Sequence, residues 1–284
     1  MTAPGLGALP PRFTKMSGAG NDFLVFSEAV GVGAAEAAAI RRLCRRGTGV
    51  GADGVLFVTA EGPRRVAADY YNADGSLARF CGNGTRCAAR FAALKGLAPE
   101  TLIVRTGWGD VGARVEAGRV TLELPEPVAV GRAVSSLDPG ATLRREAYAL
   151  AVGVPHVVAF VADGVDLATL DLARLGPALR HHPEMRDGAN ASFAEVLGPC
   201  RLRVRTWERG VEAETLACGA GSVATAVTAA ALGRVAAPVS LETRSGQVLE
   251  VGFRFAGEVA RDVTLAGDAR VVFEGTLDPK EWEE

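Results

Sequence analysis

Short apolar segments bounded by glycine, proline and polar residues recur along the chain and predict β-strands. The clearest segments are Val55–Thr59, Val66–Tyr71, Leu102–Thr106, Val120–Leu124, Leu202–Trp207, Val239–Thr243 and Ala269–Phe273. Two alanine-rich segments predict helices of about three turns, each opened by a glycine-rich turn and ended by a glycine. Because alanine is the least bulky helix former, each helix is expected to be enclosed by close-packed strands.

The two predicted helices begin at related motifs. Cys81-Gly82-Asn83-Gly84 and Cys218-Gly219-Ala220-Gly221 are separated by 137 positions (218 − 81 = 137), and of the 16 positions from Cys81 to Gly96, seven are identical in the second copy. A cysteine aligned with a cysteine is not explained by composition when the chain has only five. The chain is therefore expected to be a duplicated unit.

Composition and charge exclude several classes of protein. The chain has 284 residues, 48% of them apolar, with 31 Lys plus Arg against 33 Asp plus Glu and a net charge of −2, which is typical of a globular protein and gives no basic face for nucleic acid. No apolar run reaches the roughly 18 residues of a membrane helix, and residues 1–12 lack a signal-peptide pattern and are expected to be a disordered tail. Five irregularly spaced cysteines favour free thiols and a reducing, cytoplasmic compartment.

Two motifs are interpreted as structural. Gly49–Gly54 matches a dinucleotide-binding fingerprint by letter, but a predicted helix, Ala34–Arg46, precedes it and a predicted strand follows it, which is the reverse of the required order. Cys81 and Cys87 are not at zinc-ligand spacing, and no histidine lies near them in the sequence. His181 and His182 are expected in solvent, and His156, between apolar runs, is by default a structural histidine.

Cys81 and Cys218 carry the candidate chemistry. Most free cysteines are small core residues, as is expected of Cys44, Cys87 and Cys200. Cys81 and Cys218, however, each stand where a glycine-rich turn enters a helix, and there the backbone N–H groups and the helix dipole stabilise a thiolate and bind a carboxylate. Two such thiols on opposite sides of a carbon atom are what inversion of a stereocentre needs, because one removes the proton and the other delivers one.

These residues lie in segments that resemble the bacterial diaminopimelate epimerase family, whose members are cofactor-independent amino-acid epimerases. The matching segments run in family order from about residue 13 onward: Lys15–Phe23, Gly49–Gly54, Asn72–Ser76, Cys81–Cys87, Pro155-His156, Glu208–Gly210 and Thr215–Gly221. The resemblance implies a mixed α/β (α+β) fold of two pseudo-symmetric domains, each a β-barrel-like sheet wrapped around a central helix, with the active site in the cleft between them. The implied domains are 13–127, completed by 268–284, and 128–267.

The resemblance also implies a role for each site residue. Cys81 and Cys218 are the catalytic pair, and His156 and Glu208 tune them. The substrate-binding positions are Asn21, Asn72, Gly82, Asn83, Asn190, Glu208, Arg209, Gly219 and Ala220, with Arg209 facing the distal carboxylate of the substrate. No metal or other cofactor is implied. The implied protein is a cytoplasmic homodimer that acts on diaminopimelate, in lysine and peptidoglycan-precursor synthesis, and binds neither nucleic acid nor membrane.

The sequence departs from the best-known members at a few positions. Val154 stands where they carry an asparagine that contacts the distal end of the substrate, Gly54 where some carry glutamine, and Ala220 where serine or threonine is frequent. Two alternatives to diaminopimelate epimerisation therefore remain. One is racemisation of another amino acid, and the other is a redox-responsive protein that binds an amino acid without turnover.

Overall fold

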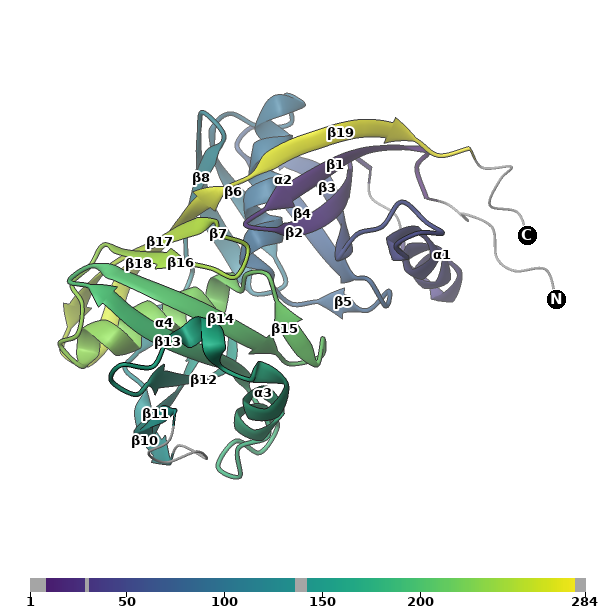
Figure 1. The fold of residues 1–284 in the computed structure, drawn as a ribbon. Coiled ribbons are helices and arrows are strands. Elements are labelled where there is room, and N and C mark those ends of the chain that lie inside the picture. Colours follow the sequence, from purple (N-terminus) through teal and green to yellow (C-terminus); the bar gives the residue numbers. More distant parts are fainter. Residues whose placement is uncertain (1–8, 29–30, 136–141, 279–284) are drawn as a thin grey trace. The chain divides into compact units, whose positions relative to one another are not determined.

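A computed structural model describes residues 9–28, 31–135 and 142–278 of the chain, which has a mixed α/β fold (Figure 1). The chain divides into two compact units: unit 1 comprises Met1–Pro125 and Gly267–Glu284, and unit 2 comprises Glu126–Ala266. The sequence analysis placed the corresponding boundaries after residues 127 and 267.

Unit 1 is a curved sheet with two helices. Its strands are β1 (Arg12–Gly18), β2 (Asn21–Phe26), β3 (Gly54–Gly62), β4 (Arg65–Asn72), β5 (Leu77–Ala78), β6 (Thr101–Thr106), β7 (Gly109–Glu116), β8 (Arg119–Glu123) and β19 (Arg270–Thr276), and its helices are α1 (Ala34–Cys44) and α2 (Gly82–Leu94). The strands pair in the order β19-β1-β2-β3-β4-β6-β7-β8, and β5 pairs with the end of β4. The pairs β2/β3 and β4/β6 are parallel and the others antiparallel. The strand predicted at Ala269–Phe273 therefore completes unit 1.

Unit 2 repeats this arrangement. Its strands are β9 (Val128–Ala129), β10 (Arg132–Ser135), β11 (Leu143–Val152), β12 (Val154–Val161), β13 (Asn190–Gly198), β14 (Arg201–Glu208), β15 (Ala213–Thr215), β16 (Val239–Glu242), β17 (Val248–Ala256) and β18 (Val259–Asp268), with the helical segments η1 (Leu167–Thr169), α3 (Leu172–Arg180) and α4 (Gly219–Ala231). The order β10-β11-β12-β13-β14-β16-β17-β18 has the same sequence of parallel and antiparallel pairs as unit 1. The predicted duplication is confirmed.

A central helix is enclosed in each unit. Helix α2 contacts β1 to β4 and β6 to β8, and its buried alanines pack among Val58, Val104 and Leu122. Helix α4 contacts β11 to β14, β16 and β17, and ten of its thirteen residues are buried, so it presents almost no face to solvent. Such close approach on all sides requires small side chains, which explains the alanine-rich sequence.

The structure corrects the expectations for the N-terminal tail and His182 and supports the one for the Gly49–Gly54 segment. Of the predicted tail, residues 1–8 lie outside the described part of the chain, whereas Leu9 is buried in a core cluster, so the folded unit begins before residue 13. His182 is also buried, so the expectation of a solvent-facing residue was wrong. Its Nε2 atom lies 2.9 Å from the carbonyl oxygen of Ser135. The Gly49–Gly54 segment does follow a helix and precede a strand, so it is not a dinucleotide fingerprint.

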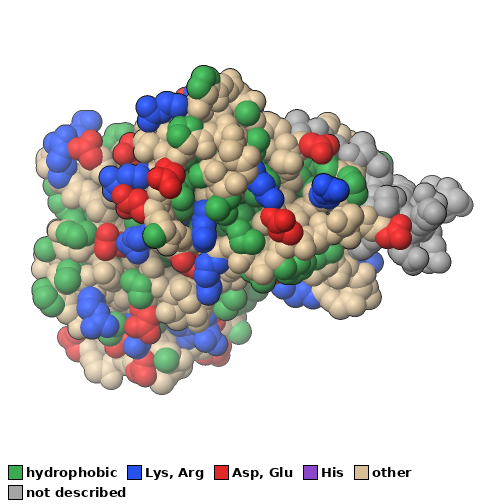
Figure 2. Space-filling view, turned by 90° about the horizontal axis from the view of Figure 1, so that it is seen from above, with side chains coloured by type: hydrophobic (Ala, Val, Ile, Leu, Met, Phe, Trp, Pro, Cys, Tyr) green, Lys and Arg blue, Asp and Glu red, His purple; other side chains and the backbone are tan. Residues whose placement is uncertain are grey.

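Surface charge and helix length are the features relevant to nucleic-acid binding and to membrane insertion. On the face shown in Figure 2, Lys and Arg side chains are interspersed with Asp and Glu side chains and form no extended basic surface. Among the described residues, no helix is both long and apolar enough to span a membrane.

The enclosed helix gives a prediction for stability. Ala226 is fully buried in α4, so Ala226→Leu should overpack the unit and lower the free energy of unfolding by about 1–3 kcal/mol. Ala231 is exposed at the end of the same helix, so Ala231→Leu is the matched control and should change it by no more than about 0.5 kcal/mol. Urea unfolding followed by circular dichroism measures both. Equal effects of the two substitutions would contradict the enclosure of α4.

Candidate active site

The two cysteines of the repeated motif occupy equivalent positions at the start of the central helices. Cys81 is the N-cap of α2, and its Sγ atom accepts a hydrogen bond from the backbone N–H of Gly84 at 3.4 Å. Cys218 is the N-cap of α4, and its Sγ atom accepts from the N–H of Gly221, also at 3.4 Å. Both side chains are partly exposed. Each sulfur therefore lies at the positive end of a helix dipole.

The residues after each cysteine fix the turn in the same way. The Thr85 hydroxyl donates to the carbonyl oxygen of Cys81, and the Ser222 hydroxyl donates to that of Cys218, both at 2.9 Å. Gly221 is needed for close packing, since a Cβ atom there would lie 2.9 Å from the Ser192 hydroxyl oxygen. The N–H groups of Gly82, Asn83, Gly219 and Ala220 belong to the first helical turns, where N–H groups point along the helix axis toward its N-terminus and are suited to bind an anion such as a carboxylate.

In unit 1, a chain of hydrogen bonds joins the cysteine turn to two predicted substrate-binding residues. Arg86 Nη2 donates to Asn83 Oδ1 at 2.7 Å, Asn83 Nδ2 donates to Asn21 Oδ1 at 2.6 Å, and Asn21 Nδ2 donates to Asp53 Oδ2 at 2.9 Å. Asp53 also pairs with Arg46 at 2.9 Å. Asn21 and Asn83 are thus brought together, whereas Asn72 lies at the end of β4 and bonds Ser76 at 3.0 Å.

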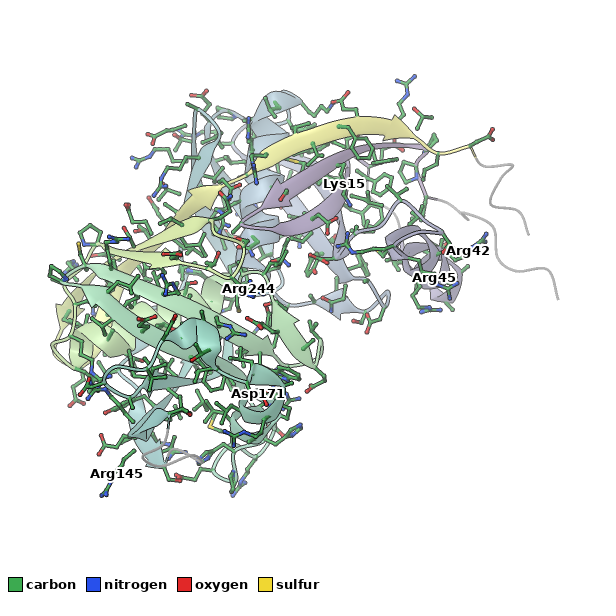
Figure 3. The ribbon with its side chains drawn as sticks, viewed as in Figure 1. Lys15, Arg42, Arg45, Arg145, Asp171 and Arg244 are labelled. Atoms are coloured by element: carbon green, nitrogen blue, oxygen red, sulfur yellow. The ribbon has the colours of Figure 1, made fainter. Side chains whose placement is uncertain are left out.

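A second charged group supports the β1–β2 turn of unit 1. Lys15, labelled in Figure 3, forms an ion pair with Asp22 at 2.8 Å and donates to the carbonyl oxygen of Gly51. Arg46 pairs with the same aspartate at 2.6 Å. Desolvation by burial acts to raise the pKa of Asp22, but hydrogen bonds and charge interactions with Arg46 and Lys15 outweigh it and lower the pKa. Asp22 is therefore ionised at neutral pH and anchors the segment that carries Asn21.

In unit 2, three predicted residues meet at neighbouring strand ends. His156 on β12 is in register with Asn190 on the parallel strand β13, and Asn190 Oδ1 accepts the backbone N–H of Arg209 at 2.8 Å. Glu208 ends β14 and accepts the Thr215 hydroxyl at 2.5 Å. Alternation along the strands places Asn190 and Glu208 on the same faces as Ser192 and Thr206.

That shared face leads to Cys218. The Ser192 and Thr206 hydroxyl oxygens lie 3.2 Å apart, and both lie close to Gly221 in the first turn of α4. Asn190 and Glu208 continue the same face at the strand ends. Asn190 and Glu208 thus lie one step along the strands from the two hydroxyl groups that adjoin the turn of Cys218.

His156 is the most unusual titratable group of unit 2. Its side chain is fully buried, and neither ring nitrogen has a hydrogen-bond partner among the residues that the structure describes. Burial, and to a smaller extent the charge of Arg209, lower the pKa of His156 to about 3. His156 is therefore neutral at physiological pH, which leaves one ring nitrogen as a donor and the other as an acceptor.

The other three cysteines are separate from this chemistry. Cys44 and Cys87 are buried, and burial raises the pKa of each to about 12, so both remain protonated at neutral pH. Cys200 is exposed in the turn between β13 and β14. No group of three or more potential metal ligands occurs among the residues that the structure describes.

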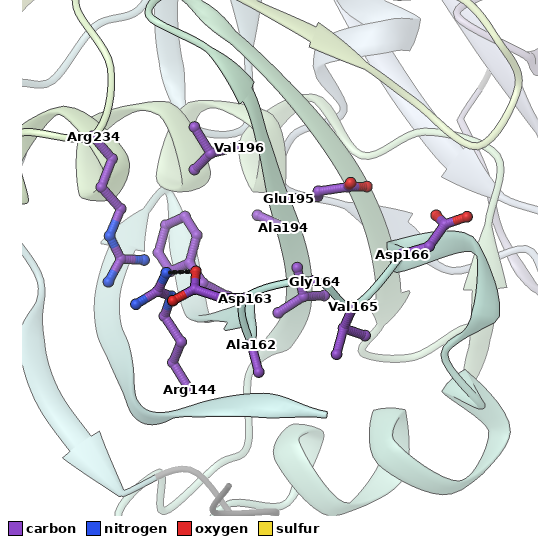
Figure 4. Close-up of a pocket in the computed structure, with 12 residues that line it drawn as sticks. Arg144, Ala162, Asp163, Gly164, Val165, Asp166, Ala194, Glu195, Val196 and Arg234 are labelled. Atoms are coloured by element: carbon purple, nitrogen blue, oxygen red, sulfur yellow. Dashed lines mark hydrogen bonds and ion pairs between the residues drawn. The ribbon is translucent and has the colours of Figure 1, made fainter. Parts of the chain in front are cut away.

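Unit 2 also contains a surface pocket of about 290 Å³ that none of the predicted site residues lines (Figure 4). It lies between the ends of β11, β12 and β13, where Arg144 pairs with Asp163 and the Arg234 guanidinium stacks 4.2 Å from the centre of the Phe160 ring. The cysteine turn is thus not part of this pocket.

Two residues that bond the predicted site residues were not predicted from the sequence. Arg86 is fully buried and bonds the cysteine turn, and Asp53 accepts from Asn21. Both lie in segments that the family resemblance covers. A signal for Arg86 was present in the sequence, because it is a long charged residue near the start of a helix that is otherwise built from small residues for enclosure.

Comparisons with known proteins find similar sequences that cover most of the chain. The sequence model described as diaminopimelate epimerase matches residues 13–129 and 148–254. The diaminopimelate epimerase of Chlorobaculum tepidum is 38% identical over 269 residues, which cover 92% of this chain and 99% of that protein. The diaminopimelate epimerase of Archaeoglobus fulgidus is 38% identical over 285 residues, covering 93% and 95%.

Solved structures of similar fold are more distant in sequence. A probable proline racemase from Agrobacterium radiobacter has a TM-score of 0.67 at 17% identity and covers 94% of this chain and 92% of its own. A PhzF-family protein from Bacillus anthracis has a TM-score of 0.67 at 14% identity, covering 94% and 98%. These likenesses concern the fold alone. The matches to the sequence model and to full-length relatives, together with the two cysteine turns, show that the chain belongs to the diaminopimelate epimerase family.

Proposed function

We propose that the protein interconverts LL- and meso-2,6-diaminopimelate and that Cys81 and Cys218 are its two catalytic acid–base residues. The observation that carries the proposal is the matched pair of cysteine turns, each with its sulfur at the N-terminus of an enclosed helix. Diaminopimelate is the proposed substrate because the chain is similar to diaminopimelate epimerases over nearly its whole length.

The mechanism uses the two cysteines in opposite protonation states. The thiolate of one cysteine removes the Cα hydrogen as a proton, and the electron pair of the broken C–H bond is delocalised into the α-carboxylate. The thiol of the other cysteine then delivers its proton to the opposite side of the same carbon. The two cysteines thereby exchange protonation states, and nothing is oxidised or reduced.

The mechanism requires a particular arrangement of the two units. In the proposal, each unit is a β-barrel-like wrap around its central helix, and the two turns face each other across a cleft. The N–H groups of Gly82, Asn83, Gly219 and Ala220 then hold the α-carboxylate and stabilise the charge that develops on it. No pyridoxal phosphate or metal is needed. By family resemblance, the active form is proposed to be a cytoplasmic homodimer.

The remaining residues position the substrate and set the electrostatics. Asn21, Asn72 and Asn190 are proposed to hold polar groups of diaminopimelate, and the Arg209 guanidinium to hold its distal carboxylate, for which a planar fork of donors is suited. His156 and Glu208 are proposed to tune the cysteines, with His156 as a neutral hydrogen-bonding group. Val154 lies two residues before His156 on β12, on the same face of the strand, so its departure from the usual asparagine affects the same region.

Replacement of either cysteine tests the pair. Cys81→Ala and Cys218→Ala should each lower kcat for conversion of LL- to meso-diaminopimelate by about 10²–10⁴-fold or more, because each removes one of the two proton-transfer groups. Chiral chromatography of the product measures the rate.

Cys200→Ala and Cys87→Ala are the controls and should retain the activity, since Cys200 is exposed outside the site and Cys87 stays protonated. Near wild-type turnover by Cys218→Ala would refute the two-base assignment. If wild-type protein bound an amino acid but exchanged no Cα hydrogen for deuterium in heavy water, the non-catalytic alternative would replace the enzyme.

Burial of neutral His156 predicts a specific pH dependence of stability. Its pKa is about 3 in the folded protein and about 6.5 when unfolded, so below pH 6.5 the unfolded state binds a proton that the folded state does not. This residue should therefore lower the free energy of unfolding by about 2 kcal/mol between pH 7 and pH 5.

Urea unfolding at each pH measures the effect. His156→Gln should remove this part of the pH dependence, whereas His181→Gln, at an exposed histidine, should leave it unchanged. An unchanged slope in His156→Gln would show that folding does not lower the pKa of His156.

Substrate selection tests the role of Arg209. Diaminopimelate should be epimerised far better than lysine, because lysine lacks the distal carboxylate, and Arg209→Met should remove a charge-assisted interaction of about 1.5–3 kcal/mol, or about 10- to 150-fold in kcat/KM. Val154→Asn should change kcat/KM by less, because a neutral hydrogen bond contributes about 0.5–1.5 kcal/mol. If lysine or another monocarboxylic amino acid turned over as well as diaminopimelate, racemisation of another amino acid would be the better assignment.

A further inference from the structure

The two cysteine turns have the same geometry but different charges around them. The offset that aligns Cys81 with Cys218 aligns Arg86 with Val223, so only the turn of unit 1 has a guanidinium in its first helical turns. The last residue of β4 is Asn72, and the last residue of the equivalent strand β14 is Glu208, so only unit 2 has a carboxylate at that strand end. The cation of unit 1 favours a negative charge on Cys81, whereas the carboxylate at the end of β14, which Arg209 follows in the sequence, gives Cys218 no such stabilisation.

Arg86 is an unusual cation because it is fully buried and, among the described residues, makes no direct ion pair, although the Asp268 carboxylate acts on it through its charge. The Arg86 side chain has no exposed surface. It donates to the backbone oxygens of Asp268 and Gly82 at 3.2 and 3.5 Å and to Asn83 Oδ1 at 2.7 Å, and no ion pair involves it in the part of the chain that the structure describes. A buried charge is costly unless an opposite charge offsets it.

The acidic groups near this end of α2 are already paired with other cations. Asp22 pairs with Lys15 and Arg46, Asp53 pairs with Arg46, and Asp268 pairs with Arg270 at 2.9 Å. The charged or ionisable groups of unit 1 that act on Arg86 or its neighbour Cys87 are Asp268, Cys81, Arg90 of α2 and Arg119 of β8. Asp268 already pairs with Arg270, and Cys87 remains protonated, so Cys81 is the thiol near Arg86 that is able to add a further negative charge.

Arg86 also fixes the orientation of two side chains that the proposed function uses. A guanidinium only donates and an ionised carboxylate only accepts hydrogen bonds, so Arg86 at one end and Asp53 at the other determine which way the amides of Asn83 and Asn21 point. Without Arg86, Asn83 Oδ1 loses its donor, and Asp53 alone is left to hold the orientation of the two amides.

We infer that Arg86 is a positioning residue that makes the two cysteines unequal, favouring the thiolate at Cys81 and the thiol at Cys218 in the substrate-free protein, and that it orients Asn83 and Asn21. The expected difference in ionisation between the two thiols does not depend on the proposed function. Only its expected effect on turnover rests on that function. Burial lowers the pKa of Arg86, but an arginine remains charged, so its field persists at every pH at which the protein is folded.

The asymmetry is measurable without turnover. Wild-type protein is treated with iodoacetamide over a range of pH, and alkylation of the Cys81 and Cys218 peptides is followed separately by mass spectrometry. The midpoint of each rate against pH reports the ionisation of that thiol independently of its accessibility. We expect the midpoint of Cys81 to lie at least about one pH unit below that of Cys218, which is about a tenfold difference in thiolate population at a pH below both midpoints.

Variants assign the asymmetry to Arg86. In Arg86→Gln the midpoint of Cys81 should rise by about one unit while that of Cys218 stays unchanged, and the acid limb of kcat/KM against pH should move with it. Arg86→Lys keeps the charge without the planar fork, so it should retain most of the difference between midpoints but raise KM through misoriented Asn83 and Asn21. Arg90→Gln, one turn further along α2, is the control and should shift neither midpoint.

The outcomes separate this inference from the proposed function. Equal midpoints in wild-type protein, or a lower midpoint for Cys218, overturn the inference, although both cysteines are then still required for epimerisation. A shifted Cys81 midpoint with no diaminopimelate turnover supports the inference and refutes the function. If Arg86→Gln does not fold, as circular dichroism shows, the wild-type midpoints and Arg86→Lys still decide the result.

Discussion

The hydrogen bond from a backbone N–H to a cysteine sulfur at a helix N-terminus is the interaction on which the site depends. It occurs twice, at the same length of 3.4 Å, and in each case it makes the thiol the cap of a helix that the rest of the unit encloses. A sulfur is a weak acceptor, so a neutral cysteine is a poor cap compared with serine or aspartate. A thiolate is a better one. The position therefore gains stability as the cysteine ionises, which links the folding of the helix to the chemistry.

Enclosure of the helices holds each N-terminal cysteine in a fixed position within its unit. A helix that contacts strands on all sides cannot slide or rotate without opening cavities or clashes, because protein interiors are close-packed. Small residues keep the strands close, and glycine at position 221 lets β13 and β14 approach the first turn. The same constraint holds the N–H groups of that turn in a fixed direction. A rigid donor array needs little reorganisation when charge develops on a bound carboxylate.

Sequence reasoning identified the duplication, the enclosed helices and the two cysteines, because all three depend on local patterns that the repeat presents twice. It did not reveal the burial of His182, which depends on a contact with Ser135 that lies 47 residues away. It did not single out Arg86 either, because an arginine on a helix is normally solvated, and its burial depends on the strands around α2 and on a hydrogen bond to Asp268, 182 residues away. In both cases, the missing information was a contact between segments far apart in the chain.

Duplication makes the two copies alike, whereas inversion of a stereocentre requires their two cysteines to differ in charge. Two equivalent turns are suited to remove a proton from one side of a carbon atom and deliver one to the other side. The repeated fold gives both turns the same geometry. In the proposed mechanism, however, catalysis in one direction starts with one cysteine charged and the other neutral. Two thiolates facing one substrate carbon would repel each other, so the proposed pair would resist double ionisation. Which member ionises is decided by residues outside the motif, and substitutions such as Arg86 opposite Val223 and Asn72 opposite Glu208 change the charge of each copy without altering its backbone.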